Sequence, residues 1–411
     1  MAVLDFSEQD LNGNNFNGQN LDGSTFFKAT LTNVSFVGTS LIGTNFREVS
    51  TNGINFSDAD LRDADLFKAV LSGEQSNRPN LTGANFSDAD GDGIGADLTE
   101  ADLKAADLTN ANFTNAILEG TKFEVNIIDN TNFTGAKFNP GTGFTDITLS
   151  GAIFDLATLS GVNWTDVAAP QGQTSTNVSF RGADLTNFSA EDLNLAGADF
   201  SNFNASNPTI LTGVSLADTV LNDANFTGVS AEGIFLEDAN LTNANFTGAD
   251  LSNANLNNAN LSGAILTGGV ELDGAFLEGV DFSGVDLTDA NLSGANLKGA
   301  DFTGADLTGA DLSGADLTEA ILIGAELDDA NLFGANLNKA DLTNAIFIDG
   351  ADADTLGADL SSIDFVDGIA VGGNFTDALF VNANLSKADF TGATTTGANF
   401  TGATLVDTIG L

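Results

Sequence analysis

One feature limits the fold of this chain more than any other: from Leu272 to Phe347, every fifth residue is Leu or Phe, at sixteen of sixteen positions. Two residues before each of them lies a small apolar side chain, Ala at thirteen positions and Val at three. A period of five fits neither the 3.6-residue turn of an α-helix nor the plain alternation of a long strand. It fits a three-residue extended segment followed by a two-residue corner, with both apolar residues on the inner face. The spacing therefore predicts a narrow parallel β-solenoid.

The complete unit reads Ala, then Asp or Asn, then Leu or Phe, then any residue, then Gly, as in residues 300–304 and 305–309. Gly takes the last place in ten of the sixteen units, which suits a tight corner with unusual backbone angles. This unit resembles the repeat of the pentapeptide-repeat family, over nearly the whole chain. The resemblance implies an all-β fold, the right-handed quadrilateral parallel β-helix, with four repeats in each coil.

An N-terminal block of aromatic residues supports four sides independently. Phe recurs every ten residues, and Leu takes the positions between. On a four-sided coil this spacing places Phe on two opposite walls, and rings twenty residues apart then stack at the strand spacing of about 4.8 Å. Packing alone explains these residues, which are Phe6, Phe16, Phe26, Phe36, Phe46 and Phe56, with Leu11, Leu21, Leu31 and Leu41 between them.

The repeat predicts one solenoid domain over residues 1–411, with about twenty coils. At about 4.8 Å per coil the rod would be roughly 100 Å long. Residues 75–79 replace a repeat without loss of phase. Elsewhere the phase slips, and we expect corner loops near residues 87–97, 139–143, 165–179, 204–210, 268–271 and 348–358.

The charge of the chain excludes several functions. It has 57 acidic and 12 basic residues, a formal net charge of −45, and no basic residue between Arg181 and Lys298. Direct binding of nucleic acid needs Lys and Arg to neutralise phosphates, so we expect none, and an acidic membrane surface would repel the chain. The absence of Cys and His removes thiol nucleophiles, Cys-ligated zinc and the usual general base. We therefore expect no enzymatic activity and no required cofactor.

The first residues have neither a basic segment nor an apolar run, so no cleavable secretory signal is expected. No segment is apolar enough to enter a membrane. These features favour the cytoplasm by default, with secretion through an uncleaved C-terminal signal as the alternative.

One acidic run predicts a cation site. Asp88, Asp90, Asp92 and Gly93 match the first half of an EF-hand or dockerin calcium loop, in which alternate carboxylates converge on one cation. The second half departs from that pattern, because the twelfth position holds Thr99 and Glu100 comes one place late. The alternative is a solvated acidic bulge, since residues 57–60 carry the same Ser-Asp-Ala-Asp sequence inside an unbroken repeat. Calcium is therefore an optional ligand in this interpretation.

The outward position of the repeat builds an acidic face in which Asp301, Asp306, Asp311 and Asp316 occupy the four sides of one coil. Along the predicted rod the net charge amounts to roughly one per 2.2 Å, against one per about 1.7 Å in duplex DNA. The family resemblance adds that some members imitate DNA and inhibit DNA gyrase. One functional hypothesis is therefore a DNA mimic that regulates a DNA-binding protein. The simpler alternative is that Asp and Asn keep the wall soluble and bond locally.

The main functional hypothesis concerns the two ends of the solenoid. The repeat phase already holds at Phe6 and Leu11, and it continues through Phe400 and Leu405. An open end exposes strand edges and apolar core, and natural solenoids usually cover both. We therefore expect a non-enzymatic structural rod whose ends pair head-to-tail into filaments or larger assemblies. Another protein is the alternative partner.

Overall fold

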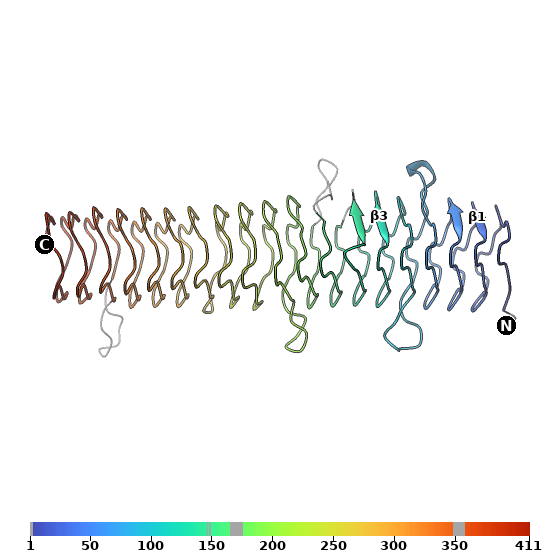
Figure 1. The fold of residues 1–411 in the computed structure, drawn as a ribbon, viewed down its shortest axis with the longest axis horizontal. Helices are drawn as coiled ribbons and strands as arrows, with labels where there is room; N and C mark the ends of the chain where they lie inside the picture. The colour runs from blue at the N-terminus through green and yellow to red at the C-terminus, as the bar shows by residue number, and fades with distance from the viewer. Residues whose placement is uncertain (1–2, 146, 148, 165–175, 348–357) are drawn as a thin grey trace. The chain divides into compact units, whose positions relative to one another are not determined.

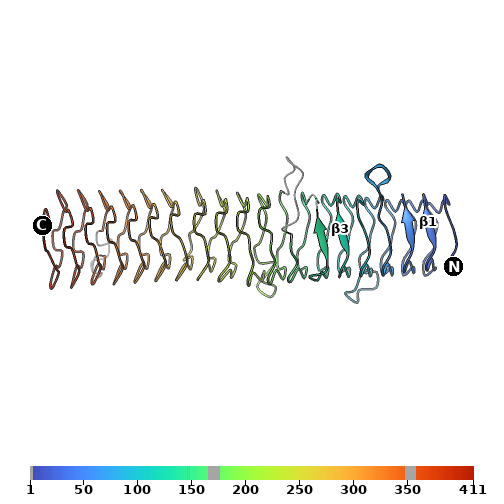
Figure 2. The same cartoon turned by 45° about the horizontal axis from the view of Figure 1, so that its top comes forward.

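The structure is a computed structural model that describes residues 3–145, 147, 149–164, 176–347 and 358–411. The chain divides into two compact units, which we call unit 1 (Met1–Ser215) and unit 2 (Leu216–Leu411). Each unit is a stack of coils joined by parallel backbone pairing (Figures 1 and 2). The described residues contain a single short 3₁₀ helix and no helix that is long and apolar enough to cross a membrane.

Unit 1 contains the four strands assigned among the described residues. Strand β1 (Thr30–Thr32) pairs in parallel with β2 (Ser50–Asn52), and β3 (Lys122–Glu124) pairs in parallel with β4 (Gly143–Thr145). The remaining pairing consists of single parallel bridges, as between Asn45 and Asp65. The partner usually lies twenty residues further along the chain, as expected for four five-residue repeats per coil.

Unit 2 is built from parallel bridges alone in its described part. One face follows Asp281, Asp301 and Ile321, each bridged to the next. The inward Ala and Leu or Phe positions are buried almost without exception between residues 216 and 347. The hydrophobic alternation in the sequence thus gives the predicted inner face, because a three-residue extended segment turns its first and third side chains the same way.

Most of the described corners are β-turns whose third residue has a positive φ. At one corner the N–H of Ala305 donates to the carbonyl of Phe302 (3.0 Å), and Gly304 has a φ of 64°. A type II turn requires this left-handed conformation. Asp or Asn takes the same place at other corners, as at Asp289 (φ 58°), because their side chains tolerate it best among non-glycine residues.

Stacked phenylalanines fill the core of the first coils. Phe16 and Phe36 stack with centroids 5.1 Å apart, and Phe36 and Phe56 with centroids 5.0 Å apart. A second column stands opposite, and its rings meet the first edge to face, as Phe26 meets Phe36 at 5.5 Å and 88°. The predicted columns on opposite walls are confirmed.

Insertions lengthen individual coils without breaking the stack. Residues 75–79 do not replace a repeat as predicted, because Asn55 pairs with Asn80 rather than with residue 75. This segment leaves the coil and contains the 3₁₀ helix η1 (Gln75–Asn77). Further on, Asp65 pairs with Asp97, so residues 87–94 also stand outside the regular coil.

Three of the other expected loops lie among the described residues, and two lie mostly outside them. A one-residue step appears where Lys122 pairs with Gly143, and another where Asp250 pairs with Glu271. At residues 204–210, Asn204 and Asn207 form an antiparallel bridge. Residues 165–175 and 348–357, which carry most of two expected loops, lie outside the described residues.

Candidate functional site

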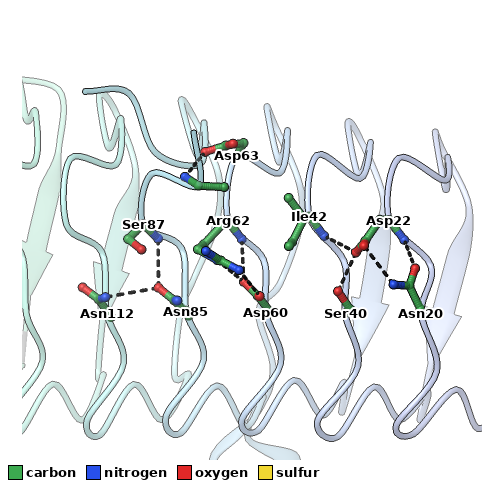
Figure 3. Close-up of polar contacts among 11 residues, drawn as sticks. Asn20, Asp22, Ser40, Ile42, Asp60, Arg62, Asp63, Asn85, Ser87 and Asn112 are labelled. Carbon is green, nitrogen blue, oxygen red and sulfur yellow. Dashed lines mark hydrogen bonds and ion pairs between the residues drawn. The ribbon is translucent and has the colours of Figure 1, made fainter. Parts of the chain in front are cut away.

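The acidic loop of unit 1 brings together Asp63, Asp88 and Asp90. One carboxylate oxygen of each lies within 4.8 Å of the others. Asp88 and Asp90 come from the predicted loop, whereas Asp63 lies at a corner of the neighbouring coil. The N–H of Ala89 donates to Asp63 Oδ1 (2.9 Å) and ties the loop to that corner (Figure 3). Asp92, the third predicted ligand, is not in this group.

Backbone donors surround the carboxylate of Asp88. The N–H of Gly91 donates to Oδ1 and that of Gly93 to Oδ2, both at 2.7 Å. These hydrogen bonds, that of Gly91 first, hold the pKa of Asp88 below its ordinary value. The side chain is therefore ionised at neutral pH, and its two oxygens order the loop.

A cavity of about 330 Å³ lies next to this cluster. Carboxylate oxygens are the ligands that calcium prefers, and calcium takes six to eight oxygens. The cluster supplies three oxygens, so the donor type fits calcium while most of the coordination would have to come from elsewhere. The cavity is lined by Asp63, Ala64, Asp65, Asp90, Asp92, Ile94, Gly95, Asp97 and Ile117.

Two further carboxylates that bear on the calcium hypothesis form ion pairs. Glu100 forms an ion pair with Lys68 (3.3 Å), so it does not supply the late ligand of a calcium loop. Asp60, in the similar sequence 57–60, takes both Arg62 Nε (2.8 Å) and Arg62 Nη2 (2.7 Å) (Figure 3). The two Ser-Asp-Ala-Asp sequences thus have different roles, because residues 87–90 leave the coil whereas residues 57–60 stay in it.

Sequence reasoning missed Asp63 for a physical reason. A regular coil would place Asp63 beside residue 83, but the extra segment at residues 75–79 shifts the pairing so that Asp60 lies beside Asn85. Asp63 therefore lies level with Asp88. The signal in the sequence was the irregular segment at residues 75–79. Because this insertion has the length of one repeat, the spacing of Leu and Phe after it does not reveal that the coil is longer.

The four aspartates predicted to build an acidic surface around one coil belong to unit 2. Asp301, Asp306, Asp311 and Asp316 each belong to a different series of parallel bridges, hence to four different faces. Asp301 Oδ1 accepts the N–H (2.9 Å) and the hydroxyl (2.6 Å) of Thr303, and the other three accept the N–H two residues on. Asp or Asn at this position thus closes the following turn, which accounts for the residue choice without a ligand.

Carboxylates and amides also link successive coils. Asn331 Nδ2 donates to Asp311 Oδ1 (3.0 Å), and Asn336 Nδ2 donates to Asp316 Oδ1 (3.0 Å). In unit 1, Asp22 accepts the hydroxyl of Ser40 (2.6 Å) from the next coil (Figure 3). Alternation of Asp with Asn therefore relieves repulsion between neighbouring carboxylates.

The four residues predicted for an end interface differ in exposure. Leu11 is buried and Phe6 is half-buried in the first coil, where Phe6 stacks on Phe26 with centroids 4.8 Å apart. In the last coil Phe400 is half-buried and stacks on Phe380 (4.9 Å), while Leu405 is 46% exposed. Three of the four thus present surface at an outer coil, and Leu11 does not.

Comparison with known proteins gives a match to one family model. The model described as pentapeptide repeats matches in eight copies, which together span just over half of the chain. No curated protein matches this chain. The matched segments are residues 35–73, 94–124, 236–268, 271–309, 310–347 and 358–394.

Several solved structures are similar to parts of the chain. HetL, a pentapeptide repeat protein involved in heterocyst differentiation regulation in the cyanobacterium Nostoc sp., is 31% identical over 56% of this chain and 87% of its own, with a TM-score of 0.27. A pentapeptide repeat protein from the Arabidopsis thaliana thylakoid lumen is 35% identical over 28% of this chain and 66% of its own (TM-score 0.19). QnrB1, a plasmid-mediated fluoroquinolone resistance protein, is 18% identical over 59% of this chain and 88% of its own (TM-score 0.23).

Proposed function

Since this chain belongs to the pentapeptide-repeat family, we propose that it is a non-enzymatic scaffold whose copies join head-to-tail through their outer coils. We further propose that residues 1–411 form one right-handed quadrilateral β-helix of about twenty coils, as the family resemblance implies. Within that proposal, coil edges are the natural surfaces for assembly, because they carry unpaired strand groups and core side chains.

The exposure of core positions in the last coil carries the proposal. Phe380 and Leu385 are buried in the coil before it, whereas Phe400 is half-buried and Leu405 is 46% exposed at the equivalent inward positions. A further coil stacked on this edge would bury both. Phe400 would then extend the stack that it forms with Phe380, as each ring in the first coils stacks on the next.

The edge of the first coil, in unit 1, carries side chains that compete with pairing. Gln9 Nε2 donates to the carbonyl of Asp5 (3.1 Å), and Gln19 Nε2 donates to that of Asn15 (3.4 Å). Inside the stack the equivalent carbonyl accepts a backbone N–H from the preceding coil, as Asp65 does from Phe46 (2.7 Å). Docking of another edge would displace both glutamine amides, so they weaken the association without preventing it.

Charge repulsion also opposes assembly. Each copy carries a formal charge of −45, and salt screens such repulsion over a distance that shrinks to about 3 Å at 1 M ionic strength. Apolar burial at the edges does not weaken with salt in this way. Association should therefore strengthen as salt concentration rises.

The test is static light scattering of the 411-residue chain at 50 and 500 mM sodium chloride. We expect concentration-dependent oligomers, more at the higher salt, and at least a fivefold weaker association for the Phe400→Ser, Leu405→Ser variant. Phe333 is exposed on the side of a coil and not at its edge. Its replacement by Ser is the control and should leave the association unchanged. Monomers at every concentration and salt would refute the proposal, and so would equal association of all three proteins.

A second proposal rests on the acidic side chains on all four faces of unit 2. Through them the chain would imitate DNA toward a DNA-binding protein such as DNA gyrase. A supercoiling assay with purified gyrase separates the two proposals. The DNA mimic inhibits at micromolar concentration, whereas the scaffold has no effect.

A further inference from the structure

Unit 1 covers an outward-facing phenylalanine with a cation from its own chain. The guanidinium carbon of Arg47 lies 4.3 Å from the ring centroid of Phe67. Arg47 Nη1 also pairs with Asp65 Oδ2 (3.0 Å), two residues before the ring. The cation therefore contacts an aromatic face and a carboxylate that lie side by side on the outer surface, a favourable combination for a guanidinium.

At two further places in unit 1 a cation contacts both a ring and an acid. The ammonium of Lys28 lies 4.8 Å from the ring centroid of Phe27 and 3.6 Å from Glu48. The guanidinium carbon of Arg181 lies 5.1 Å from the ring centroid of Phe203, and its Nε lies 3.9 Å from Asp199. Outward rings in this unit are thus repeatedly covered by a cation that also pairs with an acid.

Unit 2 carries two such rings on one face. Phe235 and Phe276 occupy the outward position where this unit mostly has Asp or Asn, and each is 49% exposed. Both bridge to Asn255, which lies between them, so they are two coils apart on the same face. Two strand spacings separate the rings by roughly 10 Å.

Each of these rings has an acid two residues further on. Glu237 and Glu278 are both exposed, and Glu237 Oε2 accepts a hydrogen bond from Asn255 Nδ2 (3.1 Å), which places that carboxylate beside the face. In these two pairs the ring comes before the acid in the sequence, whereas Asp65 comes before Phe67. Side chains two residues apart still share a surface in either order.

Among the described residues, no Lys or Arg lies over either ring or forms an ion pair with either acid. No Lys or Arg occurs between Arg181 and Lys298. Lys298 lies one coil beyond Glu278, and its charge acts on Glu319, whose pKa it helps to lower after the larger effects of Lys339. Among the described residues, every cation placed over a ring belongs to unit 1.

We propose that Phe235 with Glu237 and Phe276 with Glu278 form a double receptor for two arginine side chains of a basic segment in a partner protein. Each guanidinium stacks on a ring and pairs with the adjacent carboxylate, as Arg47 does on Phe67. A separation of roughly 10 Å matches arginines three residues apart in a polyproline II segment, which rises about 3.1 Å per residue and has three residues per turn, so that both side chains point the same way. The surrounding acidic surface attracts such a segment from a distance.

A synthetic peptide tests this receptor on the full-length protein. The probe is an eight-residue Gly/Ser peptide with two arginines three positions apart, labelled with fluorescein and followed by anisotropy in 150 mM salt. The Phe235→Ala, Phe276→Ala variant keeps the net charge and should bind about tenfold more weakly. The matched control, Phe333→Ala with Ile369→Ala, removes two other exposed apolar side chains of unit 2 and should bind within twofold of the unaltered protein.

A second variant separates the roles of ring and acid. Glu237→Gln with Glu278→Gln keeps the rings and should also weaken binding, by more than the control substitutions Glu326→Gln with Asp341→Asn on other faces. Circular dichroism checks that each variant keeps its fold, which exposed positions should allow.

Three results would overturn the proposal. Binding of the peptide to the double phenylalanine variant within twofold of the unaltered protein would assign the affinity to overall charge. Equally tight binding of a peptide with citrulline in place of both arginines would show that the positive charge is not recognised. Dimers of the unaltered protein that are lost in the Phe235→Ala, Phe276→Ala variant would assign this face to a second copy of the chain.

Discussion

The ring of Phe26 lies 4.9 Å from that of Phe46, one coil further on, and the two planes differ by only 5°. Phe26 has no exposed surface, and it also meets Phe16 and Phe36 edge to face. Its neighbour Phe27 points the opposite way and carries the ammonium of Lys28 on its outer face. Two adjacent residues of the same type therefore have very different energetic roles.

Replacement of Phe26 by Ala should lower the free energy of unfolding by about 3–5 kcal/mol, because it leaves a cavity between stacked rings. Replacement of Phe27 by Ala should cost no more than about 1 kcal/mol, since it removes one exposed cation–π contact. Urea unfolding followed by circular dichroism measures both. Equal losses would contradict the assignment of Phe26 to the core.

The corner at Gly304 predicts a second pair of effects. Its φ of 64° is left-handed, and a Cβ there would meet no atom within 4 Å, so backbone strain alone should decide the outcome. Gly304→Ala should destabilise unit 2 by about 1 kcal/mol. Gly304→Asn should cost less, because Asn344 already adopts a φ of 59° at another corner. Thermal unfolding compares the two, and a loss for Asn as large as that for Ala would show that the corner is not set by φ.

The acidic loop predicts a pH effect of definite sign. Because the folded pKa of Asp88 is lowered, its contribution to loop stability is present above the ordinary Asp pKa of 3.8 and is lost as pH falls through the lower folded value. Asp88→Asn replaces one acceptor by a donor facing Gly93. The variant loop should therefore exchange amide hydrogens faster at neutral pH, and its difference from the unaltered protein should diminish as pH falls through the lowered folded pKa of Asp88.

Hydrogen exchange of the peptide that spans residues 88–94 measures this difference. Protection in residues 300–320 serves as the internal reference, since those residues should not respond to the substitution. A difference that grows as pH falls would contradict the predicted sign.

The calcium hypothesis has a sharper form once Asp63 is included. Since Asp63, Asp88 and Asp90 converge, Asp63→Asn should abolish any heat of calcium binding in isothermal titration calorimetry. Asp92→Asn should reduce that heat less. Asp58→Asn, in the unbroken repeat, is the control and should leave the heat unchanged. If the unaltered protein gives no heat of calcium binding, the calcium hypothesis is wrong. If only the Asp92 variant loses that heat, the calcium ligands are those predicted from the sequence.

Much of the fold could be predicted because the repeat is local. Leu307 and Ala305 are inward because they lie two residues apart in one short extended segment, whatever the neighbouring coil contains. The columns through Phe26 and Phe36 followed from spacing in the same way. The acidic cluster was less accessible, since Asp63 joins Asp88 only through pairing between coils.

The repeat period by itself determined which side chains face inward and where corners need left-handed residues, whereas the hydrogen bonds by which Asp or Asn closes the turns came from the structure. Alternation and turn geometry act within five residues, so one sequence carries them completely. Only the tertiary structure decided which coil lies level with which: that residues 75–79 leave the stack, that Glu100 pairs with Lys68, and that Arg47 covers Phe67. The physical reason is that contacts between coils depend on the number of residues in each coil, and one insertion that keeps the phase shifts them all.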